Sequence, residues 1–158
     1  MPKILIVYYS RSGNTERMAN IIKEGVVSEK IDVEIKKAEN TTVNDLLSAD
    51  GIIMGSPTYY GTMAYEMKKI IDESVSHHGK LEGKIGAAFT SAGNIGGGNE
   101  TTILDILNTM LIHGMIIQGD PKGDHYGPVA IKKIDERSEK MCLKLGKRTA
   151  QLVKKMFG

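Results

Sequence analysis

Cysteine is nearly absent from the sequence, which has one residue of this type, Cys142, in 158. A single cysteine excludes an internal disulfide and any metal cluster built from cysteines, and no metal site is expected. We interpret Cys142 as a small apolar filler inside a helix. Long apolar runs are also absent, because no stretch approaches the roughly 18 to 20 apolar residues that cross a bilayer. The first residues enter a strand without a signal-peptide pattern, so the sequence predicts a cytoplasmic protein with no membrane role.

A strong excess of charge of one sign is lacking too, since the formal net charge is +2. The charge is uneven, however, because residues 132–158 hold nine basic and three acidic residues. These basic residues are spaced around an expected closing helix, so a solvated helix face explains them better than a nucleic-acid surface does. No internal repeat is present, and the chain is predicted to form one domain, residues 1–158.

Five expected strands alternate with segments of helical periodicity. Four are short apolar runs rich in β-branched or small residues, at 4–8, 50–56, 84–90 and 115–117. Residues 31–36 alternate apolar and charged residues, as an edge or half-exposed strand does. The helical patterns follow them at about 16–26, 43–48, 63–71, 103–113 and 134–157. This alternation predicts an α/β fold, a doubly wound five-stranded parallel sheet with helices on both faces. Ligands of such folds bind at the carboxyl ends of the strands.

The first expected strand ends in Ser10-Arg11-Ser12-Gly13-Asn14-Thr15, which leads into the first helical pattern. Such a turn directs free backbone N–H groups and the positive end of a helix dipole beyond the strand, which makes an anion site. Three hydroxyls and the Asn14 amide add donors, and Gly13 permits close backbone approach. The alternative is an ordinary polar turn that only caps the helix, with Asn14 or Thr15 as the N-cap.

Lysine is missing from this first loop. A phosphate held by dipoles and hydroxyls suits a monoester that is bound and kept, whereas phosphoryl transfer calls for a lysine and a metal. Neither G-x-x-x-x-G-K-[ST] nor G-x-G-x-x-G follows the first strand, which excludes a P-loop and a dinucleotide fingerprint. A receiver domain of the same topology would need carboxylates at the ends of strands one and three, where the sequence has Tyr9-Ser10 and Ser56-Pro57.

Two more loops at the same edge have unusual compositions. Pro57-Thr58-Tyr59-Tyr60-Gly61 holds two aromatic rings suited to stacking on a planar heterocycle. One ring is expected to pack beneath the next helix, and Tyr60 is the better candidate for the ligand. The run from Ser91 to Gly98 has four glycines in eight residues and offers backbone N–H groups to a polar ring edge, unless it is only a flexible connection. The three loops together predict a phosphate pocket beside a slot for a flat ring, which is the shape of FMN.

These motifs resemble the flavodoxin superfamily, and nearly the whole chain takes part in the resemblance. The first loop is similar to the family's FMN-phosphate loop. Gly55-Ser56-Pro57-Thr58-Tyr59-Tyr60-Gly61-Thr62-Met63 resembles the isoalloxazine loop of WrbA-like NAD(P)H:quinone oxidoreductases, G-[ST]-P-T-aromatic-[FY]-G-x-M. His113-Gly114-Met115 resembles the histidine segment near the flavin in that subgroup. The resemblance implies a flavodoxin-like sheet with the strand order 2-1-3-4-5.

The resemblance also implies a set of site residues. Tyr60 and His113 would shape the slot of the electron acceptor, and His113 would donate a hydrogen bond or proton to it, unless it only serves the dipole at a helix C-terminus. Arg11 is a further candidate contact, for a phosphate of NADPH. The implied FMN-binding residues are Ser10, Arg11, Ser12, Gly13, Asn14, Thr15, Pro57, Thr58, Tyr59, Tyr60, Gly61, Ser91, Ala92, Gly93, Asn94, Ile95, Gly96, Gly97 and His113.

Two departures from the WrbA-like pattern bear on function. The insertion that helps to build the tetramer does not fit into residues 38–43, and the segment after the fifth strand is trimmed to residues 119–129, where His125-Tyr126-Gly127 resembles a remnant of an aromatic-glycine turn. The preferred hypothesis is an FMN enzyme that uses NAD(P)H for two-electron reduction of quinones or similar small acceptors. The alternatives are a flavodoxin-type one-electron carrier with a redox protein partner, and an NAD(P)H-dependent FMN reductase. A homo-oligomer, dimer or tetramer, is left open.

Overall fold

Unbroken apolar runs form the central layer of the structure, a computed structural model that describes all residues 1–158. β1 (Lys3–Tyr8), β3 (Gly51–Pro57) and β4 (Ile85–Ala92) are almost wholly buried, whereas β2 (Asp32–Lys37) is half-exposed, as an edge strand is. The strands are parallel in the order β2-β1-β3-β4-β5, in which β5 is Ile116–Ile117. The predicted strand order is therefore confirmed.

A further strand, β6 (Val129–Ile131), is not expected from the sequence. It pairs with the end of β4, where Thr90 is opposite Val129, while β5 pairs with the beginning of β4, where Ile85 is opposite Ile116. β5 and β6 are thus two parts of one edge position, and the chain between them, residues 118–128, makes an excursion away from the sheet. A run of three apolar residues is too short to show strand periodicity.

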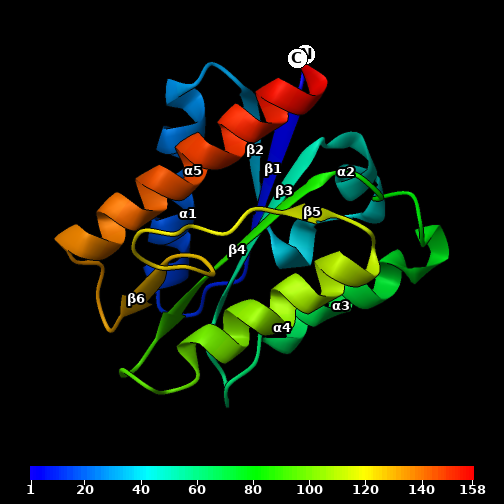
Figure 1. The fold of residues 1–158 in the computed structure, drawn as a ribbon. Helices are drawn as coiled ribbons and strands as arrows, with labels where there is room; N and C mark the ends of the chain where they lie inside the picture. The colour runs from blue at the N-terminus through cyan, green and yellow to red at the C-terminus, as the bar shows by residue number, and fades with distance from the viewer.

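Helices cover both faces of the sheet (Figure 1). α1 (Asn14–Ser28) and α5 (Glu136–Phe157) pack together on one face, and α3 (Tyr65–Glu73) and α4 (Asn99–Ile112) lie on the other. No helix of the structure is both long and apolar enough to span a bilayer.

Short helical segments link β2 to β3 and α3 to β4. They are η1 (Ala38–Asn40), α2 (Val43–Ser48) and η2 (Ser74–His77). α2 has the bounds that the sequence predicts, and Thr42 is its N-cap. The Asp45 N–H donates to the Thr42 hydroxyl at 3.3 Å, and the Thr42 N–H donates to the Asp45 carboxylate at 2.8 Å, which is a capping box.

Two separate cores follow from the alternation of side chains along the strands. Ile4, Ile6 and Phe89 belong to the core under α1 and α5, while Leu5 and Val7 belong to the core under α3 and α4. Because β1, β3 and β4 each contribute to both cores, their sequences are continuous apolar runs rather than alternating ones.

Glycines at the crossing of α1 and α5 let the two helix backbones touch. A Cβ at Gly25 would lie 2.4 Å from the Leu143 carbonyl oxygen, and a Cβ at Gly146 would lie 2.1 Å from the Ile22 carbonyl oxygen. Any side chain at either position would push the helices apart. This contact fixes α1, and with it the loop at its N-terminus, against the long closing helix.

Candidate functional site

The first loop connects β1 to α1 at the carboxyl edge of the sheet. Gly13 is the N-cap of α1 and has a left-handed backbone, with φ +99°. Its N–H donates to the Ser10 hydroxyl at 3.1 Å. The next three N–H groups, of Asn14, Thr15 and Glu16, have no acceptor in the protein. They are the orphan donors of a helix start, and with the helix dipole they form an anion site. Neither Asn14 nor Thr15 is the N-cap, as the alternative interpretation of this turn would have it, and no side chain caps the helix.

A pocket of about 270 Å³ opens where the first loop meets the ends of β3 and β4. Its charged lining residues are Arg11 and Lys132, and no carboxylate lines it. A pocket with free N–H donors, two cations and no acidic group suits an anion such as a phosphate monoester. The lining residues are Arg11, Ser12, Asn14, Thr15, Pro57, Thr58, Tyr59, Ser91, Ala92, Gly93 and Lys132.

Buried hydroxyls tie the three loops together beneath this pocket. The Thr15 and Ser91 hydroxyls are 2.8 Å apart, the Thr58 and Thr90 hydroxyls are 2.9 Å apart, and Thr90 donates to the Ser56 carbonyl at 2.7 Å. Thr15 is only 2% exposed, and its hydroxyl is already paired. Thr15 therefore offers its backbone N–H to the pocket, while its side chain holds the first loop against β4.

The second loop forms a tight turn beside the pocket, and its residues Pro57, Thr58 and Tyr59 line the pocket. Tyr59 and Thr62 exchange two backbone hydrogen bonds of 2.9 and 3.1 Å, with Tyr60 and Gly61 at φ +51° and +76° between them, as in a type I′ turn. Tyr60 is fully exposed and does not line the pocket. Tyr59 is half-buried. It lines the pocket, with its ring edge-on to Tyr9 at a centroid distance of 6.5 Å.

The glycine loop, residues 91–98, is bonded to the first residue of α4 and contacts the second loop. The Asn99 amide donates to the Asn94 carbonyl at 3.2 Å, and the Gly96 N–H donates to the Asn99 side chain at 3.3 Å. At its end it touches the second loop, because a Cβ at Gly98 would lie 2.5 Å from the Gly61 Cα. The Thr101 hydroxyl also donates to the Gly61 carbonyl at 2.8 Å. Asn94, Ile95, Gly96 and Gly97 remain exposed, so the loop can present its backbone to a ligand.

His113 lies at the opposite edge of the sheet, so its predicted place beside a flavin ring is wrong. α4 starts at the carboxyl edge and ends at Ile112, and the following Gly114 carbonyl accepts from the Gly83 N–H, just before β4 begins. The His113 Nε2 is 2.7 Å from the Ser74 hydroxyl, and its ring lies 5.9 Å from that of His78. Burial lowers the pKa of His113, and a charge on His78 lowers it further. His113 fits the alternative interpretation, a residue that closes the helix.

Lys132 is a pocket residue that the sequence did not reveal. Its N–H donates to the Ala92 carbonyl at 2.8 Å, and its carbonyl accepts from the Asn14 side-chain amide. These bonds place Lys132 between the end of β4 and the first loop. In the sequence Lys132 is only the first cation of the basic tail, and the three-residue strand that carries it to the pocket has no recognisable pattern.

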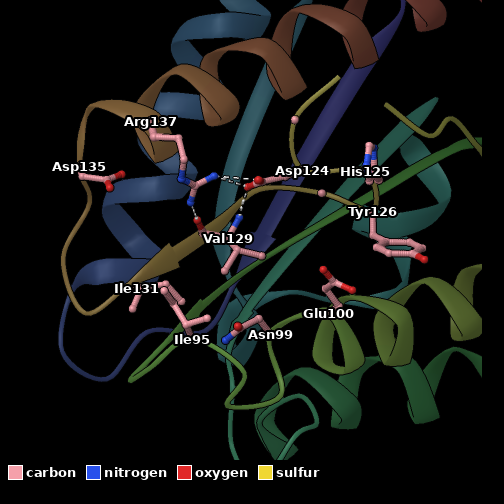
Figure 2. Close-up of a pocket in the computed structure, with 12 residues that line it drawn as sticks. Ile95, Asn99, Glu100, Asp124, His125, Tyr126, Val129, Ile131, Asp135 and Arg137 are labelled. Atoms are coloured by element: carbon pink, nitrogen blue, oxygen red, sulfur yellow. Dashed lines mark hydrogen bonds and ion pairs between the residues drawn. The ribbon is translucent and has the colours of Figure 1, made fainter. Parts of the chain in front are cut away.

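A second cavity of about 450 Å³ lies between the excursion and the starts of α4 and α5 (Figure 2). Two of its charged lining residues, Arg137 and Asp124, form an ion pair with each other. Arg137 donates to both oxygens of Asp124 at 2.7 and 2.9 Å and to the Val129 carbonyl at 2.6 Å. The Val129 N–H also donates to Asp124 at 2.9 Å. This network anchors the excursion, including His125 and Tyr126, to the start of α5.

Comparison with known proteins gives a consistent picture. Residues 5–100 match the family described as "Flavodoxin domain". A flavodoxin of Clostridium saccharobutylicum is 41% identical, with 98% of this chain and 99% of that protein covered. An NAD(P)H dehydrogenase (quinone) of Sinorhizobium fredii is 38% identical, with 77% of this chain and 72% of that protein covered. The solved structure of a flavodoxin, WrbA-like protein from Agrobacterium tumefaciens has a TM-score of 0.82 at 25% identity and covers 99% of both chains.

Proposed function

The chain belongs to the flavodoxin family, and from this premise we propose that it holds FMN at the carboxyl edge of the sheet and passes electrons to a redox protein partner. The observation that carries the proposal is the combination of three free N–H groups at the start of α1 with a pocket whose lining includes no carboxylate. This combination suits the phosphate of FMN.

The remaining residues of the edge suit the rest of the cofactor. Tyr59 within the pocket and the exposed Tyr60 provide aromatic surface for a flat ring. Asn94 and Ile95 are exposed and their N–H groups have no acceptor in the protein, so they are available to a polar ring edge. FMN supplies the redox chemistry when bound, and the chain binds and orients it. The hydroxyl pairs beneath the pocket keep the three loops in register, which reduces the cost of ordering them on binding.

A carrier is favoured over an enzyme by what surrounds the proposed ring slot. The residue expected to deliver a proton to an acceptor, His113, is at the far edge of the sheet. No histidine lies in the three loops, so the slot lacks the side chain that most often delivers a proton in enzymes. The chain also spans nearly the whole length of the flavodoxin relative, but 72% of the quinone dehydrogenase.

An NAD(P)H:quinone oxidoreductase is the second candidate. It is favoured by the second loop, Gly55 to Met63, whose motif matches the WrbA-like pattern throughout, and by the 38% identity to a quinone dehydrogenase. The formal net charge of +2 also gives the chain no acidic field for steering to a basic partner. In this mechanism, a nicotinamide and then a quinone-like acceptor would bind in turn above Tyr60.

One anaerobic experiment separates these functions. The purified protein is loaded with FMN and gel-filtered, and its visible spectrum is recorded before and after addition of NADH or NADPH and then of dithionite. A carrier retains the flavin, keeps its visible absorption with either nucleotide, and loses it with dithionite. Prompt bleaching by a nucleotide supports the quinone oxidoreductase. Loss of flavin when the reduced sample is gel-filtered a second time, under the same anaerobic conditions, supports an FMN reductase. Failure to retain oxidised FMN contradicts all three.

A further inference from the structure

Only three residues other than glycine have a left-handed backbone, and two of them are at the carboxyl edge. Lys30, with φ +59°, follows the last turn of α1 and donates its N–H to the Val27 carbonyl at 2.9 Å, which is an ordinary helix ending. Tyr60 belongs to the second loop. Lys132, with φ +60°, follows a strand and ends no helix. Nine glycines take positive φ elsewhere in the chain, so a lysine in this conformation is an exception.

The strained backbone of Lys132 is fixed from both sides. Its N–H is bonded to the Ala92 carbonyl and its carbonyl to the Asn14 amide, so the residue joins the strand that leads into the glycine loop to the loop that starts α1. Backbone strain persists where the surrounding structure enforces it, and it is frequent at ligand sites. Here the enforced conformation brings a cation to a loop that has no lysine of its own.

The charge of Lys132 is uncommitted in the protein. Its side chain forms no ion pair, and it lines the 270 Å³ pocket together with Ser12 and Asn14. By contrast, Arg137, Lys144 and Arg148 of the same basic tail are paired with Asp124 or Asp120. The tail is therefore not uniformly a solvated face, because its first residue lies in the wall of the pocket.

We propose that Lys132 binds the phosphate of FMN, so that the site selects FMN over riboflavin with a mobile cation as well as with the N–H groups of α1. The proposal rests on the proposed FMN site. A lysine is a point charge on a flexible stem, so it can reach a phosphate without a fixed geometry. Because Lys132 is exposed, its contribution is screened by salt and is moderate, about threefold to tenfold in affinity.

The test measures the dissociation constants of FMN and riboflavin by flavin fluorescence, for the full chain at low and high salt. Lys132→Gln should weaken FMN binding about threefold to tenfold at low salt and much less at high salt, with riboflavin binding unchanged. Lys132→Arg should keep most of the affinity for FMN. Lys133→Gln is the matched control, since Lys133 is the adjacent exposed lysine and does not line the pocket. It should bind both flavins as the parent protein does.

Lys132→Gly distinguishes the effect of the lysine charge from that of the left-handed backbone. Glycine takes positive φ without strain, so this variant should melt no lower than the parent protein while showing the same loss of FMN affinity as Lys132→Gln. Equal affinity of Lys132→Gln and the parent protein for FMN would overturn the proposal, and so would an equal loss for FMN and riboflavin. If the parent protein binds neither flavin, the proposed function itself fails, which is a different outcome.

Discussion

Helix α4 has a left-handed glycine next to each end, and the two ends serve different purposes. Gly98, with φ +96°, lies so close to Gly61 that a Cβ would be 2.5 Å from the Gly61 Cα. At Gly114, with φ +77°, a Cβ would have the Glu82 side chain as its nearest neighbour, at 3.2 Å. The first glycine joins the two loops proposed to flank the flavin ring, and the second only lets the chain turn into β5. Residues at the start of α4 can therefore contribute to the proposed flavin site, whereas residues after its end cannot.

Gly98→Ala is expected to have the largest effect on flavin affinity, and Gly114→Ala is its comparison variant at the other end of α4. Both variants place a side chain at positive φ, which costs about 1–2 kcal/mol in the free energy of unfolding. Only Gly98→Ala also forces the second loop away from the glycine loop, so it should weaken FMN and riboflavin alike by more than about tenfold, as a cost above about 1.4 kcal/mol does. Fluorescence titration and thermal melting measure the two quantities. Equal flavin affinity in the two variants would show that the contact between the loops is irrelevant to the site.

Ser12→Ala and Ser74→Ala compare the loss of a hydroxyl at the two edges of the sheet. Ser12 lines the pocket, and a hydrogen bond from its hydroxyl to a phosphate should be worth about tenfold in FMN affinity, with little change for riboflavin. Ser74 is the partner of His113 at the far edge, so its removal should leave both flavin affinities unchanged. The same titration series checks both variants. A matching loss of FMN affinity in Ser74→Ala would mean that the two edges are coupled.

His113→Gln should change stability without changing flavin binding. Because the pKa of His113 is lowered in the folded protein, the unfolded chain takes up a proton first as the pH falls. Its contribution to stability is present above the unfolded pKa of about 6.5 and is lost as the pH falls toward the folded value. The drop in melting temperature between about pH 7.5 and about pH 5 should be smaller in His113→Gln. An unchanged drop would assign the pH dependence to other groups.

The smallest effect is expected from a thiol-alkylating reagent, because the one thiol, Cys142, is buried in the core under α1 and α5, away from both ends of α4. Burial raises the pKa of this thiol to about 12, so it is protonated and shielded in the folded protein. A thiol-alkylating reagent should leave the native protein unmodified and label it fully after denaturation, as mass spectrometry would show. Labelling of the native protein at the rate of a free thiol would mean that this core opens readily.

The sequence was a sufficient guide wherever the information is local. The apolar runs and helical periods predict the strands, the helices and the first loop, because strand–turn–helix units are encoded within about 30 residues. The strand order comes from the resemblance to the flavodoxin superfamily, not from these local patterns. The place of His113 beside the flavin ring was predicted from the short motif His113-Gly114-Met115, which does not show at which edge of the sheet the residue lies. The fourteen residues of α4 carry the chain about 21 Å, back to the opposite edge of the sheet. Lys132 was missed for the opposite reason, since it is bonded to Asn14 from 118 positions away through a pairing that three residues of β6 provide.

The interruption between β5 and β6 has a consequence for association. Ala87, Ala88 and Phe89 in the middle of β4 have no strand beside them on that side, and the excursion runs over the gap, with the Thr90 N–H donating to the Pro128 carbonyl at 3.0 Å. An uncovered strand edge is a template for another chain to add to. The excursion, which Asp120 and Asp124 tie to α5, covers this part of the edge of β4. A shortened excursion would leave the backbone of residues 87–89 open to pairing with another chain.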